Sequence, residues 1–323
     1  MRTALLLLAA VAFAQPRAAV VVAADSSGDF TTVGAAIASG AKVIRIKPGT
    51  YREVLNIPQA GVQLRGTGAR PQDVVLTYDN SAGTAGGTTN SASITISGDD
   101  FFAENLTMEN SFSRTRPLTQ QGSQAVALKI TGDRAVFRKV RFLGYQDTLY
   151  ANSKHCESDS GPCQPARQYF SDCYVEGNVD FIFGDALAFF DHCEIHALAH
   201  SAIMLTAQSR HYAEEKSGYV FDQCRITAEK GADRIYLGRP WRAYSTVIFM
   251  NTQLPPQIDP EGWREWEHDG KPSLPTSFYA EYRSQGPGAH PDTRKQLTPA
   301  EAARFALKTF LAGDDHWDPT QVH

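Results

Sequence analysis

The sequence predicts an all-β chain folded as a right-handed parallel β-helix, a solenoid with short helices at its N- and C-terminal ends. Two observations indicate this class. Short apolar stretches recur between Gly, Asp and Asn residues, with no long helix between them. An outline that begins with Phe also returns at irregular intervals, which a solenoid allows because loops of different length leave each turn. A β-sandwich would need hairpin turn signals between neighbouring strands, and these are scarce.

The N-terminus has the features of a secretory signal peptide, residues 1–14. Arg2 supplies the positive charge, Ala4 to Val11 form the apolar run, and Ala12 to Ala14 form an A-x-A cleavage site that leaves Gln15 as the new N-terminus. The apolar run is shorter than the roughly 20 residues that a bilayer span needs, and no Cys follows the cleavage site. We therefore expect a secreted chain, extracellular or periplasmic, without a membrane anchor.

Residues 15–323 contain no low-complexity linker, so we expect a single domain and a monomer. The formal net charge of −4 and the sequence pI of about 6.1 argue against nucleic acid as the partner. Five cysteines in an exported chain favour disulfides and leave one thiol over.

The N-terminal part predicts one short helix followed by strands. The helix is expected within Asp25 to Gly40, where an alanine-rich stretch ends at Gly40. The strands that follow are expected at residues 43–46, 62–64, 74–76 and 94–96.

The Phe-led outline begins at Phe102, Phe137, Phe170, Phe190, Phe221 and Phe249. Each turn of the solenoid contributes one strand, or rung, to a sheet. Stacking the copies of the outline predicts that neighbouring rungs carry the following residues at equivalent positions: Asn105, Val140, Cys173, Cys193, Cys224 and Thr252. Rungs of a β-sheet are about 4.8 Å apart, which lies within the Cα separation that a disulfide tolerates. Cys173 and Cys193 are therefore expected to form a disulfide, although the same geometry would allow Cys193 with Cys224.

A second disulfide is expected between Cys156 and Cys163, which lie seven residues apart in a loop rich in Ser, Gly and Pro. Cys224 then remains as an inert buried thiol. The C-terminal part predicts one helix that starts at the capping box Thr298 to Glu301, with Pro at the first helical position, and ends at Leu311 to Gly313. This helix should cover the side or end of the solenoid and hide a strand edge.

Two rungs carry an aspartate at the same place. Val140 to Asp147 aligns without a gap on Cys173 to Asp180, with Gly at the fifth position and Asp at the eighth in both. If the rungs are adjacent, the two carboxylates lie side by side, and one pKa rises because both cannot ionise cheaply. Such a pair suits acid/base or nucleophile/acid catalysis. The alternative for Asp180, which lies in the apolar run Val179 to Gly184, is a strand-end side chain turned to solvent.

Other residues fit roles around this pair. Arg239 offers a cation that keeps one Asp ionised, and Trp241 offers a flat face for a sugar ring. Gln124 and Gln146 carry amides that can donate hydrogen bonds to an oxyanion. Taken singly, the arginine also fits an ordinary surface charge, and the glutamines fit packing or loop residues.

Two other reaction classes lack support. His192, His196 and His200 are spaced by four, but they lie on a predicted strand and its exit, where this spacing does not converge. We therefore expect no metal and no cofactor. The sequence has no G-x-S-x-G motif, so a serine hydrolase is unsupported.

The motifs resemble those of the pectin methylesterase (pectinesterase) family over nearly all of residues 15–323. The matching segments are Gly49 to Glu53, Gln124 to Leu128, Tyr145 to Tyr150, Val179 to Gly184, Leu237 to Trp241, Gly262 to Trp266 and Phe278 to Tyr282. We expect a secreted bacterial member. The plant-type inhibitory pro-region is absent from the sequence, and the segment Ala151 to Gln168 is longer than the corresponding plant loop.

The resemblance implies a carboxylic ester hydrolase that cleaves C6 methyl esters of galacturonate units in pectin (homogalacturonan). Asp180 would be the nucleophile, and Asp147 would protonate the departing methanol and then activate water. Gln124 and Gln146 would stabilise the oxyanion, and Arg239 would keep Asp180 ionised. The sugar cleft would be lined by Tyr150, Phe183, Tyr236, Trp241, Trp266 and Thr89, the last at a position where plant members have an aromatic residue.

Three alternatives stay open at this point. A β-helix glycoside hydrolase acting on polygalacturonate would also use paired carboxylates. An esterase or thioesterase of the same fold could take another acyl substrate, and a silent solenoid could bind pectin without turnover. The glutamine pair suits an acyl oxyanion better than an oxocarbenium ion. The presence of both aspartates, both glutamines and Arg239 argues against a solenoid without catalytic activity.

Overall fold

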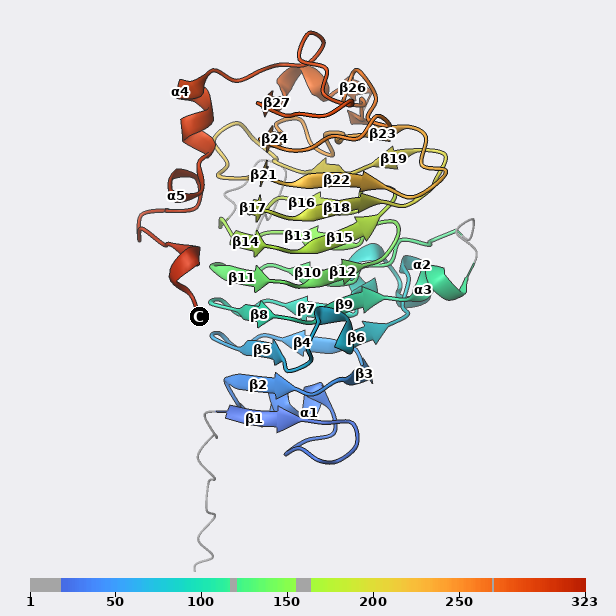
Figure 1. The fold of residues 1–323 in the computed structure, drawn as a ribbon, viewed down its shortest axis with the longest axis vertical. Helices are drawn as coiled ribbons and strands as arrows, with labels where there is room; N and C mark the ends of the chain where they lie inside the picture. The colour runs from blue at the N-terminus through green and yellow to red at the C-terminus, as the bar shows by residue number, and fades with distance from the viewer. Residues whose placement is uncertain (1–18, 117–120, 155–163, 269) are drawn as a thin grey trace, which may run out of the picture.

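The computed structural model describes residues 19–116, 121–154, 164–268 and 270–323. In these residues, parallel strands stack into three sheets that coil along one axis, so the chain is a parallel β-helix (Figure 1). The short helix α1 (Val33–Ala38) lies at the N-terminal end, and further short helices follow the last turn. The fold class predicted from the sequence is confirmed.

The three sheets contain ten, seven and six strands. The ten-stranded sheet is made of β1 (Ala19–Val22), β2 (Val43–Ile46), β5 (Gln63–Gly66), β8 (Phe102–Glu104), β11 (Ala135–Arg138), β14 (Arg167–Ser171), β17 (Leu187–Asp191), β21 (Gly218–Asp222), β24 (Thr246–Met250) and β27 (Phe278–Tyr282). The seven-stranded sheet is made of β3 (Gly49–Arg52), β6 (Val74–Tyr78), β9 (Thr107–Asn110), β12 (Arg141–Leu143), β15 (Tyr174–Gly177), β18 (Glu194–Ala197) and β22 (Arg225–Ala228). The six-stranded sheet is made of β4 (Leu55–Ile57), β7 (Ile94–Ile96), β10 (Leu128–Ile130), β13 (Leu149–Ala151), β16 (Ile182–Gly184) and β20 (Thr206–Gln208).

The remaining elements are short. Two small sheets pair β19 (Ile203–Met204) with β23 (Ile235–Tyr236), and β25 (Glu267–His268) with β26 (Lys271–Pro272). The other helical pieces are η1 (Pro71–Asp73), α2 (Ala82–Ala85), η2 (Thr88–Ser91), α3 (Phe112–Thr115), η3 (Leu274–Thr276), α4 (Pro299–Ala302), η4 (Ala303–Phe305), α5 (Leu307–Phe310) and η5 (Pro319–Gln321). Within the residues described, no helix is long and apolar enough to cross a membrane.

A column of phenylalanine rings runs through the core along the solenoid axis. Neighbouring rings are 4.5 to 4.9 Å apart and inclined by only 5° to 8°, so they stack nearly face to face. This spacing follows from the rung separation of about 4.8 Å, because equivalent side chains in a parallel sheet lie directly above one another. The column consists of Phe137, Phe170, Phe190, Phe221 and Phe249.

The first copy of the repeat was predicted one residue out of phase. In the structure Leu106, and not Asn105, aligns with Val140. Leu106 is fully buried in the core. Asn105 lies in the turn before it, with a left-handed φ of 54°, and its amide donates to the carbonyls of Gly66 and Gly68 at 3.1 and 2.8 Å. Burial of the leucine therefore decides the register, and the asparagine takes the polar turn position.

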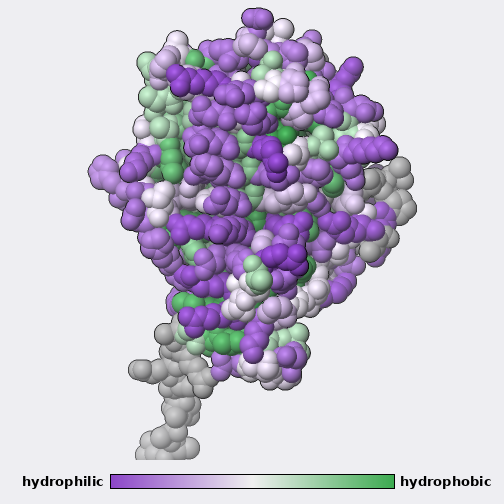
Figure 2. Space-filling view, in the orientation of Figure 1, coloured by the Kyte–Doolittle hydropathy of each residue, from purple (hydrophilic) through white to green (hydrophobic). Residues whose placement is uncertain are grey.

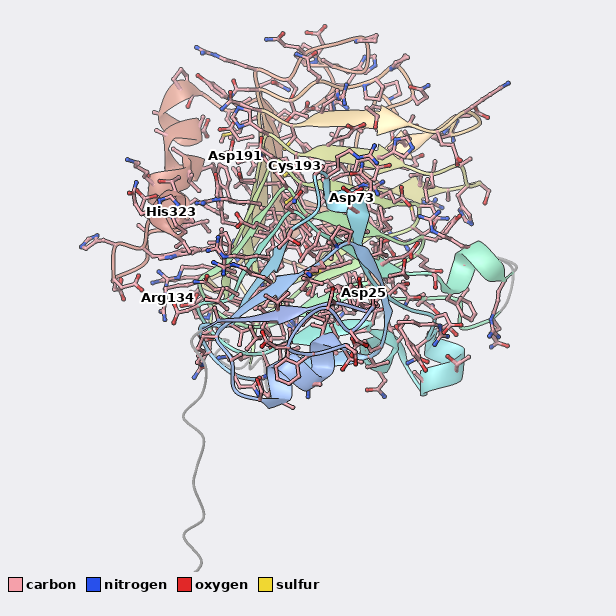
Figure 3. The ribbon with its side chains drawn as sticks, turned by 60° about the horizontal axis from the view of Figure 1, so that its bottom comes forward. Asp25, Asp73, Arg134, Asp191, Cys193 and His323 are labelled. Atoms are coloured by element: carbon pink, nitrogen blue, oxygen red, sulfur yellow. The ribbon has the colours of Figure 1, made fainter. Side chains whose placement is uncertain are left out.

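The predicted disulfide between Cys173 and Cys193 is wrong. These two residues and Cys224 do occupy consecutive rungs, but all three are free, buried thiols, and Figure 3 shows Cys193 among the strands. In an in-register parallel ladder, equivalent Cβ atoms keep the rung separation of about 4.8 Å, whereas a disulfide prefers about 3.8 Å. The Sγ atoms of Cys173, Cys193 and Cys224 instead contact main-chain carbonyl oxygens of the preceding rung. The distances are 3.5 Å to Phe137, 3.4 Å to Phe170 and 3.3 Å to Phe190, respectively.

We expect thiol-specific alkylation to modify Cys173, Cys193 and Cys224 in denaturant and to leave them unmodified in the folded protein, because all three are buried. Mass spectrometry of the digested protein measures this directly. A Cys173–Cys193 peptide recovered under non-reducing conditions would contradict the structure. Cys156 and Cys163 lie outside the described residues, so their disulfide stays a prediction that the same digest tests.

The C-terminal helix is present only in pieces. Its predicted capping box is confirmed, since the backbone N–H of Glu301 donates to the Thr298 hydroxyl at 3.3 Å. The chain does not continue as one helix to Leu311, because Ala306 is extended, with φ −63° and ψ 141°, and separates η4 from α5.

The break at Ala306 lets two phenylalanines face the solenoid. Phe305 and Phe310 are five residues apart, so in one continuous helix they would point in different directions. With the break, Phe305 packs 5.9 Å from Phe278 and Phe310 packs 6.3 Å from Phe189, both on the ten-stranded sheet. The C-terminal segment therefore covers the side of that sheet (Figure 1).

The described residues expose few large hydrophobic side chains. The face in Figure 2 is largely hydrophilic, with small, scattered hydrophobic areas. Among the described residues, Val54 is the only exposed large hydrophobic side chain. Arg134 and His323 lie on the side of the molecule where the C-terminal segment docks (Figure 3). Arg134 forms an ion pair with Asp315 at 3.5 Å.

Candidate active site

Asp147 and Asp180 lie at the starts of two adjacent strands of the six-stranded sheet. β13 pairs with β16 so that Leu149 is opposite Ile182, which puts the two aspartates, each two residues earlier, at the same register position. The backbone N–H of Asp147 donates to the carbonyl of Val179 at 3.1 Å. The adjacency that the gapless alignment predicted is confirmed.

The chain is tightly packed just before each aspartate, at a glycine three residues earlier. A Cβ at Gly177 would lie 2.3 Å from the Cβ of Phe181, and a Cβ at Gly144 would lie 2.5 Å from a side-chain oxygen. No side chain fits at either position. Asp147 and Asp180 then adopt left-handed φ angles of 66° and 52°, a conformation that Asp tolerates better than most residues.

Arg239 binds Asp180 through two parallel hydrogen bonds. Its Nε donates to Oδ1 at 2.8 Å and its Nη2 donates to Oδ2 at 2.5 Å. The guanidinium also lies 4.1 Å from the ring centroid of Trp266, and its backbone N–H donates to Thr206 at 3.0 Å. Because Asp180 is only 6% exposed, this bidentate contact compensates for the burial of its charge.

The two aspartates differ in electrostatic environment. Burial raises the pKa of Asp180, and the hydrogen bonds and charge of Arg239 oppose that rise. Burial raises the pKa of Asp147 well above its usual value, and the negative charge of Asp180 raises it further. Since Arg239 bonds to Asp180, Asp180 ionises first and Asp147 retains its proton. The pair therefore combines an anionic carboxylate with a carboxylic acid.

Gln124 and Gln146 lie just before β10 and β13, at the same ends of the strands as the aspartates. The N–H of Ala125 donates to the carbonyl of Gln146 at 3.2 Å, which holds the two glutamines on neighbouring rungs. Across the part of the chain that the structure describes, neither side-chain amide bonds to another protein group, so both can donate to a bound molecule.

A cavity of about 560 Å³ opens over these groups, a size typical of ligand sites. It brings together all five residues predicted to be catalytic and five of the six predicted to bind the sugar. Its lining consists of Gly86, Gly87, Thr88, Thr89, Asn90, Gln124, Gln146, Asp147, Tyr150, Asp180, Phe183, Ala207, Arg239, Trp241 and Trp266.

Aromatic rings form much of the cavity wall. Tyr150 and Phe183 occupy paired positions on β13 and β16 and stack with ring centroids 4.3 Å apart. Trp241 lies 6.1 Å from Phe183, and Trp266 lies 6.5 Å from Trp241. Phe183 is buried, whereas Tyr150, Trp241 and Trp266 are partly exposed, and flat, partly exposed rings suit contact with sugar faces.

One residue predicted for the sugar cleft lies outside the lining of this cavity, and most residues of one lining segment were not predicted. Tyr236 does not line the cavity; it pairs with Met204, and the guanidinium of Arg264 lies 5.9 Å from its ring. The missed residues are Gly86, Gly87, Thr88 and Asn90, which flank the predicted Thr89; Gly86 ends α2 with a φ of 77°. The two consecutive glycines do signal a turn, but nothing local relates that turn to the aspartates.

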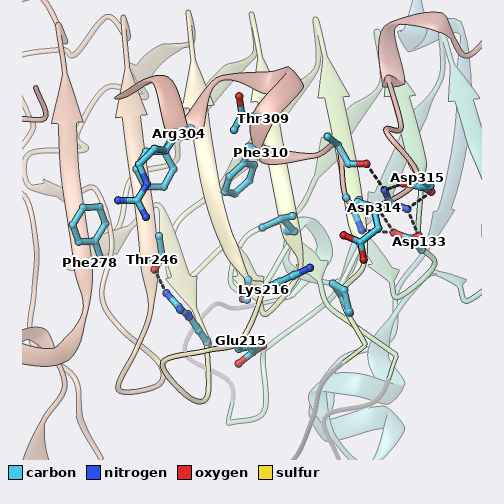
Figure 4. Close-up of a pocket in the computed structure, with 18 residues that line it drawn as sticks. Asp133, Glu215, Lys216, Thr246, Phe278, Arg304, Thr309, Phe310, Asp314 and Asp315 are labelled. Atoms are coloured by element: carbon cyan, nitrogen blue, oxygen red, sulfur yellow. Dashed lines mark hydrogen bonds and ion pairs between the residues drawn. The ribbon is translucent and has the colours of Figure 1, made fainter. Parts of the chain in front are cut away.

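A second cavity, of about 820 Å³, lies between the C-terminal segment and the ten-stranded sheet (Figure 4). Arg167 there forms ion pairs with Asp133 and Asp315, and Arg210 donates to Thr246 at 3.1 Å. None of the five predicted catalytic residues lines it. We assign this cavity to the seam where the C-terminal segment docks.

The three spaced histidines have separate partners. His192 lies 2.6 Å from an Asp191 oxygen, and His196 lies 2.7 Å from the Thr227 hydroxyl. In the described ranges, no group of three His, Cys, Asp or Glu side chains is arranged to hold a metal ion.

Fold and site together define a parallel β-helix hydrolase with paired aspartates in an aromatic-lined cavity. The family model described as Pectinesterase matches residues 19–314. The chain belongs to the pectinesterase family.

Two curated relatives are plant proteins. The chain is 39% identical to "Probable pectinesterase/pectinesterase inhibitor 17" of Arabidopsis thaliana, over 95% of this chain and 59% of the relative. It is 37% identical to "Pectinesterase 31" of the same plant, over 90% of this chain and 91% of the relative. The chain thus spans little more than half of the first relative and nearly all of the second. Plant relatives do not support the expected bacterial origin.

Solved structures have the same fold. The pectin methylesterase from carrot superposes with a TM-score of 0.80 at 32% identity, covering 95% of this chain and 96% of that one. Pectin methylesterase PemA from Erwinia chrysanthemi gives 0.79 at 31% identity, covering 95% and 99%. A pectin methylesterase in complex with a hexasaccharide gives 0.79 at 32% identity, covering 93% and 97%.

Proposed function

We propose that this chain is a pectinesterase that hydrolyses the C6 methyl esters of galacturonate units in pectin, releasing methanol and leaving acidic pectin. The observation that carries the proposal is the asymmetric pair: Asp147 and Asp180 lie side by side, and of these two carboxyl groups Arg239 forms the hydrogen bonds described above with Asp180. Membership of the pectinesterase family and the solved complex of a relative with a hexasaccharide support a polysaccharide substrate.

The reaction uses the two aspartates in sequence. The Asp180 carboxylate attacks the ester carbonyl, and the amides of Gln124 and Gln146 donate to the oxyanion that develops. Asp147 gives its proton to the departing methanol, which leaves an acyl-enzyme on Asp180. Asp147, now a carboxylate, removes a proton from water as the water attacks the acyl group, and this restores both residues.

The glycoside hydrolase remains the principal rival, because paired carboxylates also serve glycosidic cleavage. The two reactions differ in where charge develops. An ester intermediate places negative charge on an oxygen, which two amide donors stabilise, whereas an oxocarbenium ion is positive. Gln124 and Gln146, both lining the cavity, therefore favour the esterase.

We further propose export and a single catalytic domain. The signal peptide, residues 1–14, lies outside the described residues, so cleavage after Ala14 stays a prediction, as does a monomeric, unanchored enzyme. N-terminal sequencing of the exported protein tests the cleavage site.

Methyl-esterified pectin should yield methanol and protons in equal amounts, with no new reducing ends and no unsaturated product, because one ester bond is hydrolysed per turnover. The rate should survive EDTA treatment, since the proposed chemistry uses only side chains of this chain. Parallel assays of methanol, acid and reducing ends measure this. Reducing ends formed at a rate comparable to methanol would contradict the esterase and favour the glycosidase.

A further inference from the structure

The carboxylate of Glu265 lies in the segment Gly262 to Trp266, and the proposed chemistry gives it no role. Its side chain folds back on the main chain. The Oε1 atom accepts hydrogen bonds from the backbone N–H groups of Trp266, Ser273 and Leu274 at 2.9, 2.7 and 3.2 Å, and Oε2 lies 3.3 Å from the last of these nitrogens. Hydrogen bonds to a charged acceptor are stronger than those between neutral groups. Glu265 therefore joins the two ends of the hairpin that β25 and β26 form.

Trp266 directly follows Glu265, and its ring reaches the active site. It lines the cavity, and the guanidinium of Arg239 lies 4.1 Å from its ring centroid. The same guanidinium makes the two hydrogen bonds to Asp180. A cation is attracted to the face of an indole, more strongly where water is partly excluded, and the side chain of Arg239 is only 22% exposed. Arg239 is thus held from two sides, by the Asp180 carboxylate and by the ring of Trp266.

We propose that Glu265 is a positioning residue: it fixes Trp266 against Arg239, and Arg239 in turn keeps the Asp180 carboxylate in its attacking orientation. The inference rests on the proposed function. Glu265 does not itself line the cavity, so it acts on the reaction through its neighbours and not by touching the substrate.

The ionisation of Asp180 depends on how well Arg239 is held. Burial raises the pKa of Asp180, while the hydrogen bonds and charge of Arg239 and the charge of Arg264 lower it. Asp147 and Tyr279 also interact with the charge of Asp180. A weaker contact between Arg239 and Asp180 therefore raises this pKa further.

The sign of the shift separates positioning from a direct effect of charge. Positioning predicts that loss of the Glu265 side chain frees Trp266, which loosens Arg239 and raises the pKa of Asp180. A direct effect of the Glu265 charge predicts the reverse, because removal of a nearby anion lowers a carboxyl pKa. The acid limb of the kcat/KM profile measures this pKa in the free enzyme.

The test follows methanol release from a fully methyl-esterified oligogalacturonate, which has no carboxylates of its own to titrate. Glu265→Ala should move the acid limb to higher pH by about half a unit to one unit, the share of one cation–π contact. Glu265→Asp keeps the charge but is too short to reach all three N–H groups, so it should move the limb in the same direction. Glu265→Gln loses the charge but keeps an oxygen that can replace Oε1, so it should restore most of the wild-type profile.

A double substitution tests the route through Trp266. Trp266→Leu alone should move the acid limb to higher pH, and adding Glu265→Ala should move it no further, because two residues that act through one contact are not additive. If Glu265 acted through Arg264 instead, the two shifts would add. Glu261→Ala is the matched control: Glu261 is exposed in the turn four residues earlier and does not line the cavity, so the limb should stay in place.

Thermal unfolding of each variant checks that it is folded, and if Glu265→Ala does not fold, the substitutions by Asp and Gln carry the test. If the wild type releases methanol but folded Glu265→Ala or Glu265→Asp leaves the acid limb in place or moves it to lower pH, the positioning role is overturned and the proposed function stands. Additive shifts in the double substitution overturn the role in the same way. If the folded wild type releases no methanol, the proposed function fails, and the inference fails with it.

Discussion

Asp180→Asn will abolish methanol release from methyl-esterified pectin, and no acyl-enzyme will form. The asparagine preserves the shape of the side chain, but an amide is a far poorer nucleophile than a carboxylate and cannot complete the bidentate contact that Arg239 makes. We expect a loss on the order of 10⁴–10⁶ in kcat, the range seen when a nucleophile is removed from an enzyme. Methanol release and the intact mass of the protein after mixing with substrate measure both effects.

The chain offers a matched control for this variant. Asp172 also adopts a left-handed φ, of 54°, on the same turn of the solenoid, but it is exposed and does not line the cavity. Asp172→Asn makes the same chemical change in the same backbone conformation and should keep the wild-type rate. Appreciable turnover by folded Asp180→Asn would exclude Asp180 as the nucleophile.

Asp147→Asn should lower kcat by about 10²–10⁴, the usual share of general acid–base catalysis. The amide can still donate a hydrogen bond, but it cannot transfer a proton to methanol or accept one from water. An ester whose leaving group departs without a proton should recover part of the acylation rate in Asp147→Asn and none in Asp180→Asn. Rescue of Asp180→Asn instead would show that the two roles are reversed.

The pH profile of Asp147→Asn is a second readout. Wild-type kcat/KM should rise with pH as Asp180 ionises and fall as Asp147 loses its proton, because the acid form of Asp147 is needed for methanol to leave. Burial raises both pKa values, and the Asp180 charge raises that of Asp147 further, so both limbs should lie above the ordinary aspartate pKa of about 3.9. In Asp147→Asn the alkaline limb should disappear from the residual activity.

The same pKa shift affects stability. The neutral form of Asp147 is favoured in the folded state, since its folded pKa is raised above the unfolded value. Its contribution to the free energy of unfolding is therefore complete below about pH 3.9 and is lost as pH rises through the folded pKa. Asp147→Asn, which cannot ionise, should flatten this part of the stability profile, as measured by denaturant unfolding at a series of pH values.

The sequence by itself determined the solenoid and the paired aspartates. Both depend on spacing within one rung and on likeness between rungs: Phe at the same place builds the aromatic column, and Gly followed by Asp three residues later recurs at Asp147 and Asp180. In a parallel β-helix the rungs stack in register, so equal positions in the repeat become neighbours in space. One-dimensional periodicity therefore predicts three-dimensional adjacency.

Only the tertiary structure decided which contacts each rung makes with segments outside the repeat. Arg239 reaches Asp180 across 59 residues, and residues 86–90 close the cavity from another turn, which no local pattern specifies. Likewise, no local pattern specifies that Tyr236 lies outside the cavity lining.

The sequence also did not predict how closely neighbouring side chains approach or where packing shifts a register or ends a helix. Cys173 and Cys193 are neighbours, as the repeat predicted, but parallel Cβ directions leave them as thiols. Burial of Leu106 moved the first rung by one residue, and packing of Phe305 and Phe310 against the sheet broke the last helix. In each case, packing between segments far apart in the chain outweighed the local pattern, because burying an apolar side chain changes the free energy by more than a local propensity does.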